Sequence, residues 1–276
     1  MPITIARTVS ELRAARARHR QSAERFAYVP TMGALHDGHI SLIYIGKNCC
    51  ERVGASIFVN PKQFGPNEDF SRYPRTEKED VEKLEAAGAD VVFIPAVEEM
   101  YPAGASTSVS VAGLTDMLCG ASRPGHFDGV ATVVAKLLLQ AMPEVAIFGE
   151  KDYQQLQVIR RMARDLDIPA EIVGAPIARE ADGLAMSSRN RYLSAEERKV
   201  APLLYRMLGE LAKQPSPAQG LSAAREALVK QGFTKVDYLE WRDAETLHPA
   251  ADRSRPSRLF AAVFLGKTRL IDNLAL

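Results

Sequence analysis

Residues 26–43, FAYVPTMGALHDGHISLI, decide the fold expected for this chain, because a strand gives way to a helix within them. The apolar run 26–29 predicts the strand, and the pattern turns helical from Ile40 onward. His36 and His39 lie at this junction and share one face of the first helical turn. A helix start presents unpaired N–H groups and the positive end of the helix dipole, which suit a phosphate group. The stretch therefore predicts a phosphate-binding turn, with a plain turn carrying two surface histidines as the alternative.

The composition is that of an ordinary globular chain without a dominant charge. Of its 276 residues, 46% are hydrophobic and 25% are charged, and the formal net charge is +1. This length allows one large domain or two smaller ones, and the charge offers no field that would hold nucleic acid or an acidic membrane. No apolar run is long enough to span a membrane or to form a signal-peptide core. The arginines between residues 7 and 25 predict a solvated helix face, with a transit peptide as the alternative.

The cysteines argue for a reducing compartment. Cys49, Cys50 and Cys119 give an odd count with two adjacent members, which suits neither a disulfide framework nor a metal site. We therefore expect reduced thiols and a cytoplasmic location.

Buried strands alternate with helices over the first two thirds of the chain. Apolar runs predict strands at 26–30, 53–59, 91–95, 145–148 and 171–174, and the alternating run 107–111 is a further candidate. Helices are expected at 8–20, 40–50, 76–88 (opened by a capping box at Thr76 and Glu79), 130–141 and 153–166, with a polar loop at 122–129. This alternation predicts an α/β fold with a Rossmann-like parallel sheet, wrapped by helices through right-handed crossovers.

The pattern changes after about residue 177. A capping box at Ser194 and Glu197 opens a helix that should reach about residue 213, and a second helix is expected at 222–231. Short strands are expected at 236–241, 259–265 and 268–272. We therefore predict a Rossmann-like domain over residues 1–177 and a smaller α+β domain over residues 178–276.

Polar clusters follow the predicted strands, where parallel sheets bind ligands. His36 and His39 follow the first strand, Asn60 and Gln63 follow the second, and residues 149–152 follow a later one. The chain has no Walker loop and no G-x-G-x-x-G after the first strand. Any phosphate chemistry is therefore expected to use histidines and a lysine.

These residues match known signatures. H-x-G-H at 36–39 resembles that of the class I nucleotidyltransferases, and MSSR at 186–189 resembles their second, mobile phosphate-binding motif. The fuller set is similar to the pantothenate synthetase family, essentially from end to end. It consists of PTMGALHDGH at 30–39, SIFVNP at 56–61, RYPRT at 72–76, GASRPGHF at 120–127, FGEKDYQQL at 148–156 and RLIDN at 269–273.

The resemblance implies a ligase that condenses pantoate with β-alanine using ATP, through a pantoyl adenylate, with release of pyrophosphate and then AMP. It implies that His36, His39 and Lys151 are catalytic, with His39 the favoured proton donor and Lys151 a point charge on the phosphates. Little covalent help is available to such a transfer, so positioning and charge stabilisation must carry the rate. Without the resemblance, Lys151 would be interpreted as a surface lysine in a strand-exit turn.

The residues implied to bind ATP lie after two strands and at the domain junction. They are Met32, Gly33, Ala34, Leu35, His36, Asp37, Gly38, His39, Gly149, Glu150, Lys151, Asp152, Ala178, Met186, Ser187, Ser188 and Arg189. Ala178 would offer its backbone to the base, whereas Met32 has a core methionine as its alternative. Residues 187–189 would close over the triphosphate, because arginine grips phosphate oxygens in a fork, and the C-terminal domain would act as a lid.

Two glutamines are implied to hold the acid substrates. Gln63 would bind pantoate and later β-alanine, and Gln155 would bind pantoate from the other side; for either one alone, a solvated side chain is the alternative. Further candidates in the matching motifs are Asn60, Tyr73, Arg123 and His126, the last two on the acceptor side.

ATP chemistry of this kind normally needs Mg²⁺, which keeps several waters and takes few protein ligands. Glu79 and Asp80 match the family's acidic pair near the metal, although Glu79 also completes the capping box with Thr76. Lys83 departs from the neutral amide of some relatives, which weighs against a protein-held metal. A homodimer is also implied by the resemblance.

Two other functions remain open from the sequence. Another H-x-G-H nucleotidyltransferase would leave the nucleotidyl group on a phosphorylated acceptor, and such an acceptor should recruit extra arginine or lysine in place of Gln63 and Gln155. A non-catalytic nucleotide-binding module would not require His36, His39 and Lys151 together.

Overall fold

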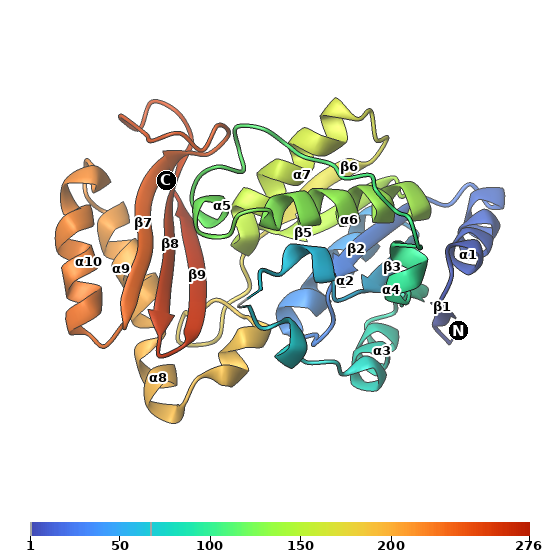
Figure 1. Cartoon of the computed structure of the whole chain (residues 1–276), viewed down its shortest axis with the longest axis horizontal. Helices are drawn as coiled ribbons and strands as arrows, with labels where there is room; N and C mark the ends of the chain where they lie inside the picture. The colour runs from blue at the N-terminus through green and yellow to red at the C-terminus, as the bar shows by residue number, and fades with distance from the viewer. Residues whose placement is uncertain (1, 67) are drawn as a thin grey trace. The chain divides into compact units, whose positions relative to one another are not determined.

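The computed structural model describes residues 2–66 and 68–276, and the chain divides into two compact units (Figure 1). The first runs to Glu150 and resumes over Gln155–Pro176, and the second comprises Lys151–Gln154 and Ile177–Leu276. The boundary expected at residues 177 and 178 assigns Lys151–Gln154 to the first domain. In the structure these four residues group with the C-terminal part of the chain, because residues of its sheet bond to them and pack on them, as described below.

A six-stranded parallel sheet organises the first unit, in the order β1-β4-β3-β2-β5-β6. Its strands are β1 (Thr4–Ala6), β2 (Phe26–Thr31), β3 (Arg52–Ile57), β4 (Val91–Phe93), β5 (Val145–Gly149) and β6 (Glu171–Ala175). The central strands β2, β3 and β5 are buried along most of their length because both faces of the sheet are covered. The predicted parallel sheet is confirmed, and the edge strand β1 is an addition that three residues were too short to reveal.

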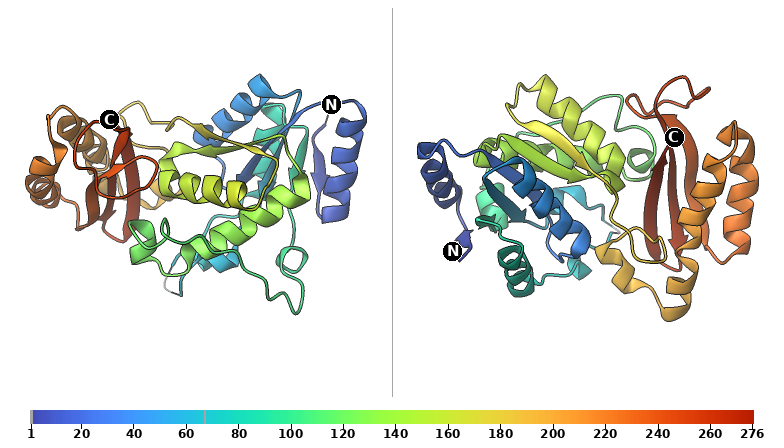
Figure 2. Two further views of the ribbon diagram at one scale, coloured as in Figure 1. Left: turned by 90° about the horizontal axis from the view of Figure 1, so that it is seen from above. Right: turned by 180° about the vertical axis from the view of Figure 1, so that it is seen from behind.

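Helices cover both faces of this sheet, with α2 and α6 on opposite sides (Figure 2). They are α1 (Val9–Gln21), α2 (Asp37–Cys49), α3 (Glu77–Ala86), α4 (Val97–Met100), α5 (Cys119–Ser122), α6 (His126–Ala141) and α7 (Tyr153–Asp165). Short 3-10 turns are η1 (Pro61–Gln63), η2 (Phe70–Arg72) and η3 (Glu150–Asp152). Right-handed crossovers explain the arrangement, because β2-α2-β3 and the later connection through α6 to β5 run in opposite directions along the sheet.

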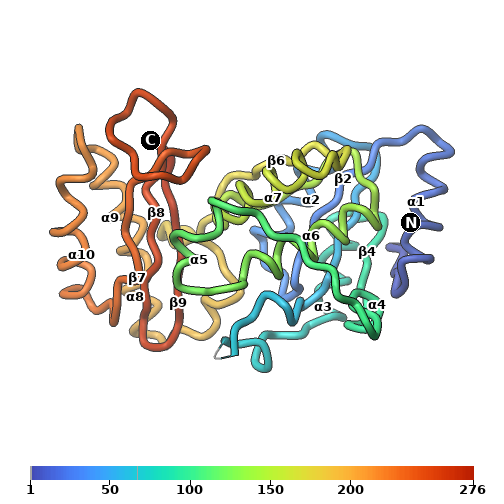
Figure 3. Tube along the Cα trace, turned by 45° about the horizontal axis from the view of Figure 1, so that its top comes forward, coloured from blue at the N-terminus to red at the C-terminus, as the bar shows by residue number. Residues whose placement is uncertain are grey.

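Three expectations for this unit are wrong. Residues 107–111 form no strand; they belong to a long irregular segment between α4 and α5 (Figure 3), and the Val109 N–H bonds to the Thr132 hydroxyl at 2.9 Å. The loop expected at 122–129 ends early, since α6 already begins at His126. The capping box expected at Thr76 is also absent, because its hydroxyl bonds to Asp80 at 3.2 Å instead of capping α3.

The second unit is a three-stranded antiparallel sheet with helices packed on one face (Figure 1). Its elements are η4 (Ser188–Tyr192), α8 (Ala195–Val200), α9 (Leu203–Ala212), η5 (Pro217–Gly220), α10 (Leu221–Lys230), β7 (Lys235–Asp243), β8 (Ser257–Leu265) and β9 (Thr268–Ala275). The capping box of Ser194 and Glu197 is confirmed, but Pro202 divides the expected single helix into α8 and α9. Leu204, Leu208 and Leu228 from the helices pack on β8 residues in a core of this unit's own.

Two further features bear on the setting of the protein. Across residues 2–66 and 68–276, no helix combines the length and the apolar character that a membrane crossing requires. All three cysteines lie in this described part, and none is joined in a disulfide.

Candidate active site

The site of the first unit lies where the strand order of its sheet reverses. The chain leaves β2 toward β3 and β4 on one side, and β5 and β6 lie on the other. β2 and β5 are neighbours, with Ala27 opposite Val145. Ligands of open α/β sheets bind beyond the carboxyl ends of the strands at such a reversal. The turn after β2 and the residues after Gly149 therefore occupy the expected position for a ligand site.

The turn after β2 has an unusual backbone conformation. Gly33 and Ala34 both have positive φ angles, +81° and +52°, a region that only glycine adopts without strain. The Thr31 hydroxyl braces the start of the turn, because it donates to the Ser56 carbonyl at 2.6 Å and accepts from the Gly33 N–H at 3.2 Å. A strained turn persists only where its surroundings hold it.

Two side chains of α3 supply that hold. Asp80 is fully buried, and its carboxylate accepts the Ala34 N–H at 2.9 Å and the Leu35 N–H at 2.7 Å. Lys83, one turn further along α3, donates to the Leu35 carbonyl at 2.8 Å. The N–H groups of Ala34 and Leu35 are thus committed to Asp80, so these residues shape the turn rather than offer those donors to a phosphate.

These contacts also bear on the expected metal ligands. Both Asp80 oxygens accept hydrogen bonds within the protein, which does not fit direct coordination of Mg²⁺ by this carboxylate. Glu79 is exposed on the neighbouring position of α3. Within the described part of the chain, no group of three or more His, Cys, Asp or Glu side chains is arranged to hold a metal ion. The metal role of Glu79 and Asp80 stays a prediction.

The two histidines meet at the start of α2. His36 is the N-cap residue, His39 is in the first turn, and their ring centroids are 4.0 Å apart. The His39 Nδ1 accepts the His36 backbone N–H at 3.4 Å. A ring nitrogen that accepts carries no proton, so the neutral His39 ring holds its proton on Nε2. The two imidazole rings therefore lie together at the positive end of the α2 dipole.

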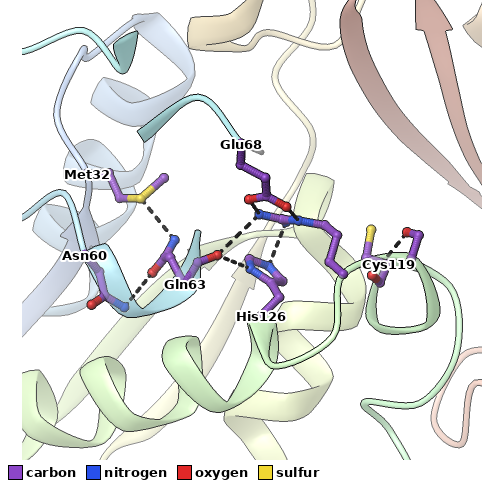
Figure 4. Close-up of polar contacts among 8 residues, drawn as sticks. Met32, Asn60, Gln63, Glu68, Cys119 and His126 are labelled. Carbon is purple, nitrogen blue, oxygen red and sulfur yellow. Dashed lines mark hydrogen bonds and ion pairs between the residues drawn. The ribbon is translucent and has the colours of Figure 1, made fainter. Parts of the chain in front are cut away.

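Gln63 lies in η1 with its amide fixed at both ends (Figure 4). Its Oε1 accepts from Asn60 Nδ2 at 3.0 Å, and its Nε2 contacts the Met32 sulfur at 3.0 Å. Asn60 is buried and is itself held, because it donates to the Gly129 carbonyl at 3.0 Å and accepts the Tyr101 hydroxyl at 2.8 Å. Burial raises the pKa of Tyr101 to about 12, so this hydroxyl keeps its proton and remains a donor. Asn60, Gln63 and Met32 thus form one connected group of predicted residues.

His126 supports the same segment from the other side (Figure 4), and Arg123 contacts both His126 and Glu68. The Arg123 guanidinium forms a two-pronged ion pair with Glu68, at 2.6 Å for each prong, and also contacts His126 Nε2 at 2.9 Å. The His126 Nδ1 lies 2.8 Å from the Gln63 carbonyl oxygen. Burial would raise the pKa of Glu68, but the hydrogen bonds and charge of Arg123 hold it below its usual value. Arg123 and His126 therefore brace Gln63, and Glu68 partners Arg123.

The remaining predicted residues of this unit are less closely connected to that group. Gln155 lies half-buried in the first turn of α7, and Gly149 ends β5. Tyr73 is buried and packs its ring against Phe64 at a centroid distance of 5.9 Å, so it belongs to an aromatic cluster beside η1.

Lys151 belongs to the second unit and follows Glu150 in η3. Its carbonyl oxygen accepts the Asn273 side-chain amide at 3.0 Å. Asn273 in turn accepts Arg258 Nε at 2.9 Å, and the Arg258 guanidinium lies 4.0 Å above the Tyr153 ring. The lysine's backbone is therefore attached to β9.

A short hairpin leads to the MSSR motif. Arg179 pairs with Ala185, and the Met186 N–H bonds to the Ala178 carbonyl at 2.9 Å. Arg179 forms a two-pronged ion pair with Asp272 on β9, at 2.7 and 2.9 Å, and stacks on Tyr205. The motif itself begins η4, where Ser187 caps the turn by accepting the Arg189 N–H at 3.2 Å.

Sequence reasoning missed several supporting residues. No local pattern marks Glu68, Tyr101 or Arg258. The partner of Glu68 is 55 residues away and that of Tyr101 is 41 residues away, whereas Arg258 bonds to a residue on the neighbouring strand β9. Asp272 and Asn273 did carry a signal, the RLIDN motif, but no role could be read from it.

Comparisons with known proteins agree with one another on the family of this chain. The family model "Pantoate-beta-alanine ligase" matches residues 4–275. The chain is 56% identical to a pantothenate synthetase of Paramagnetospirillum magneticum (99% of this chain, 97% of that protein) and 53% identical to one of Chelativorans sp. (99% and 98%). A crystal structure of the Thermus thermophilus pantothenate synthetase aligns with a TM-score of 0.89 at 49% identity, covering 99% of both chains. That of a Francisella tularensis pantoate-beta-alanine ligase, complexed with "Beta-gamma ATP and Beta-alanine", aligns with a TM-score of 0.84 at 34% identity (99% and 97%).

Proposed function

The chain belongs to the pantoate–β-alanine ligase family and condenses pantoate with β-alanine in an ATP-dependent reaction, and we propose that it does so through a pantoyl adenylate. In the first step a pantoate carboxylate oxygen attacks the α-phosphorus of ATP, and pyrophosphate leaves. In the second step the β-alanine amine attacks the acyl carbon, and AMP leaves with the electrons of the broken acyl–oxygen bond. The proton lost by the amine goes to solvent or buffer.

The histidines of α2 would serve the first step. Negative charge on the phosphates must be stabilised as the bond to pyrophosphate breaks, and a pre-set N–H donor does this without reorganisation. His39, whose Nδ1 accepts the His36 N–H, would donate from its Nε2 to the phosphates. His36 would add a second donor at the positive helix end, with Met32, Gly33, Asp37 and Gly38 lining the same turn.

Gln63 and Gln155 would orient pantoate. The Gln63 amide is fixed by Asn60 and Met32, so it loses little freedom when a substrate hydroxyl or carboxylate binds. Gln63 would then hold β-alanine, with the Arg123–His126 pair keeping its backbone in place. Because Arg123 is already paired with Glu68, we assign it a supporting role rather than direct contact with the β-alanine carboxylate.

The second unit would supply the cationic groups for ATP. Lys151 would place its ammonium on the phosphates, and Arg189 with Ser187 and Ser188 would grip the triphosphate in the manner of a lid. Gly149, Glu150, Asp152, Ala178 and Met186 would surround the adenosine. Closure over the adenylate would exclude water until β-alanine arrives.

ATP would enter as its Mg²⁺ complex. Mg²⁺ commonly binds through substrate phosphates and a few protein oxygens, and the occupied carboxylate of Asp80 favours the phosphates as its main ligands. We also propose a cytoplasmic homodimer. The absence of a disulfide among the three cysteines supports the location, and the frequency of two-fold dimers supports the assembly.

The observation that carries the adenylate mechanism is the pair of imidazoles at the start of α2, held on a turn that Asp80 and Lys83 lock. The test is exchange of labelled pyrophosphate into ATP with Mg²⁺ and pantoate present and β-alanine omitted. Exchange that requires pantoate establishes the reversible adenylate step, and added β-alanine should then yield AMP and pantothenate. Pantothenate formation without any exchange would argue against a free adenylate step, and ATP binding with no turnover would favour a binding module.

A further inference from the structure

We propose that Asn273 is a positioning residue for Lys151, which rests on the proposed role of Lys151 in the ATP reaction. The RLIDN motif at 269–273 lies on β9, far along the chain from the residues assigned to the reaction, and that assignment gives it no task. Asn273 is nevertheless 2% exposed and bonds to the backbone of Lys151 across 122 residues of sequence. A buried amide that bonds to the backbone of a residue so distant in sequence fixes the position of that backbone.

The face of the sheet on which Asn273 lies explains why it reaches η3. Asn273 pairs with Phe260 across the β8–β9 ladder, so it shares a face with Phe260 and Arg258, whereas Leu259, Ala261 and Val263 face the helices. Tyr153 lies against this first face, 5.9 Å from Phe260 between ring centroids. The segment Lys151–Gln154 therefore packs on the sheet surface opposite α9 and α10.

The chemistry of its two partners leaves one orientation for the Asn273 amide. Arginine only donates, so the atom that meets Arg258 Nε must be the amide oxygen; the Lys151 carbonyl only accepts, so the atom that meets it must be the amide nitrogen. Arg258 is itself held by stacking on Tyr153. The contacts therefore run from Tyr153 through Arg258 and Asn273 to Lys151, so that they begin and end in the segment Lys151–Gln154.

This path matters because a lysine side chain is long and mobile. Its ammonium is a point charge on a stem with four rotatable bonds, so its placement depends on a fixed main chain. Catalysis that relies on positioned charge is sensitive to small displacements, and a shift of about 1 Å can cost on the order of 100-fold in rate. Asn273 fixes the carbonyl of the residue that carries this charge.

The experiment is a double-mutant cycle on pantoate-dependent pyrophosphate exchange with the full chain. Asn273→Asp keeps the shape and the oxygen that meets Arg258, but it replaces the donor to Lys151 with a second oxygen. We expect kcat for exchange to fall about 10- to 100-fold with a smaller change in KM for ATP. The residual exchange of a Lys151→Ala variant can be followed with radiolabelled pyrophosphate. In that background Asn273→Asp should lower kcat for exchange by less than about two-fold, because its effect passes through Lys151.

Controls separate positioning from folding. Val263→Ala truncates a buried β8 residue on the helix-facing side, so it should lower the melting temperature without changing kcat per folded molecule. Should Asn273→Asp fail to fold, Arg258→Lys takes its place in the cycle, since it weakens the orientation of Asn273 and keeps the charge. Equal losses in both backgrounds, or wild-type exchange in Asn273→Asp, would overturn the inference. Wild-type exchange in Lys151→Ala alone would instead overturn the proposed role of Lys151.

Discussion

At the scale of single residues, buried polar groups here shape the backbone that carries the chemistry. Asp80 is the clearest case, because its carboxylate holds two N–H groups of a turn with positive φ angles. We expect Asp80→Asn to leave a donor facing a donor and to cost about 1–3 kcal/mol in unfolding free energy. Exchange of pyrophosphate should fall on the order of 100-fold, because His36 and His39 follow directly on this turn.

The control for this substitution is Glu82→Gln on the same helix. Glu82 is exposed and takes part in a surface pair with Lys78 at 3.9 Å, so we expect stability and exchange close to wild type. Urea unfolding and exchange measured on both variants decide the matter. An Asp80→Asn protein with wild-type pyrophosphate exchange would mean that the turn holds its shape without this carboxylate.

The ion pair of Glu68 and Arg123 gives a prediction of pH dependence. The folded protein holds the pKa of Glu68 below the ordinary value of 4.5, so the unfolded chain binds more protons in this range. The stabilisation is therefore complete above about pH 5 and is lost as pH falls below 4.5. We expect Glu68→Gln to be less stable than wild type by about 1–2 kcal/mol at neutral pH, and the difference to shrink in acid.

Unfolding by urea from pH 7 to pH 3 measures that difference. The matched control is Glu210→Gln, whose carboxylate pairs with Lys213 on the exposed surface of α9 and should show little difference at any pH. A Glu68→Gln difference that stays constant into acid would show that the charge of Glu68 does not cause it.

The positions of the site residues could be predicted from sequence better than their roles. The strand-end position of His36, His39 and Gln63 follows from hydrophobic pattern alone, and the structure confirms where they lie. The role of Asp80 could not be predicted, because a carboxylate three residues from a helix start suits a cap or a metal equally well until its partners, 45 residues away, are known.

At the scale of elements, the close packing of η1 on α6 sets where Gln63 lies. Gly129 of α6 makes this contact possible, since a Cβ there would meet the Lys62 carbonyl oxygen at 2.2 Å and the Gln63 Cα at 2.8 Å. These are backbone atoms, so Gly129→Ala must displace η1. We expect a loss of about 1–3 kcal/mol in stability and a raised KM for pantoate, measured in the coupled synthetase assay with ATP saturating.

Gly209→Ala is the matched control within another helix. Gly209 lies in α9, and a Cβ there would meet no atom within 4 Å. The substitution should therefore stabilise the protein by about 0.5–1 kcal/mol and leave the KM for pantoate unchanged. Should Gly129→Ala behave like Gly209→Ala, the packing of η1 on α6 would have no bearing on pantoate.

The elements with the strongest local pattern were the ones that sequence could predict. Apolar runs gave β2, β3, β5 and the C-terminal strands, because both faces or a full core face are buried. Residues 107–111 carried the alternation of a strand but had no sheet edge to join, and the Val109 N–H found Thr132 instead. Pairing depends on neighbours that are distant in sequence, which periodicity does not report.

At the scale of the whole molecule, two units with separate cores carry the residues proposed to contact ATP. His36 and His39 belong to the first unit, and Lys151 and Arg189 belong to the second. A ligand that binds only the folded state stabilises whatever it contacts, by about 2.7 kcal/mol at 100 times its Kd. We therefore expect Mg·ATP to stabilise both units, although their hydrophobic cores are distinct.

Hydrogen exchange of backbone amides measures each unit by itself. With pantoate and β-alanine omitted, so that ATP is not consumed, saturating Mg·ATP should slow exchange in β3 of the first unit and in β8 of the second. β-Alanine alone serves as the control, because its proposed contact, Gln63, lies in the first unit, so β8 should be unaffected. Protection by ATP confined to β3 would mean that Lys151 and the MSSR motif contribute little to binding in the ground state. Their charges would then stabilise only the transition state in which pyrophosphate departs. Substitution of Lys151 or Arg189 would in that case lower kcat without raising the KM for ATP.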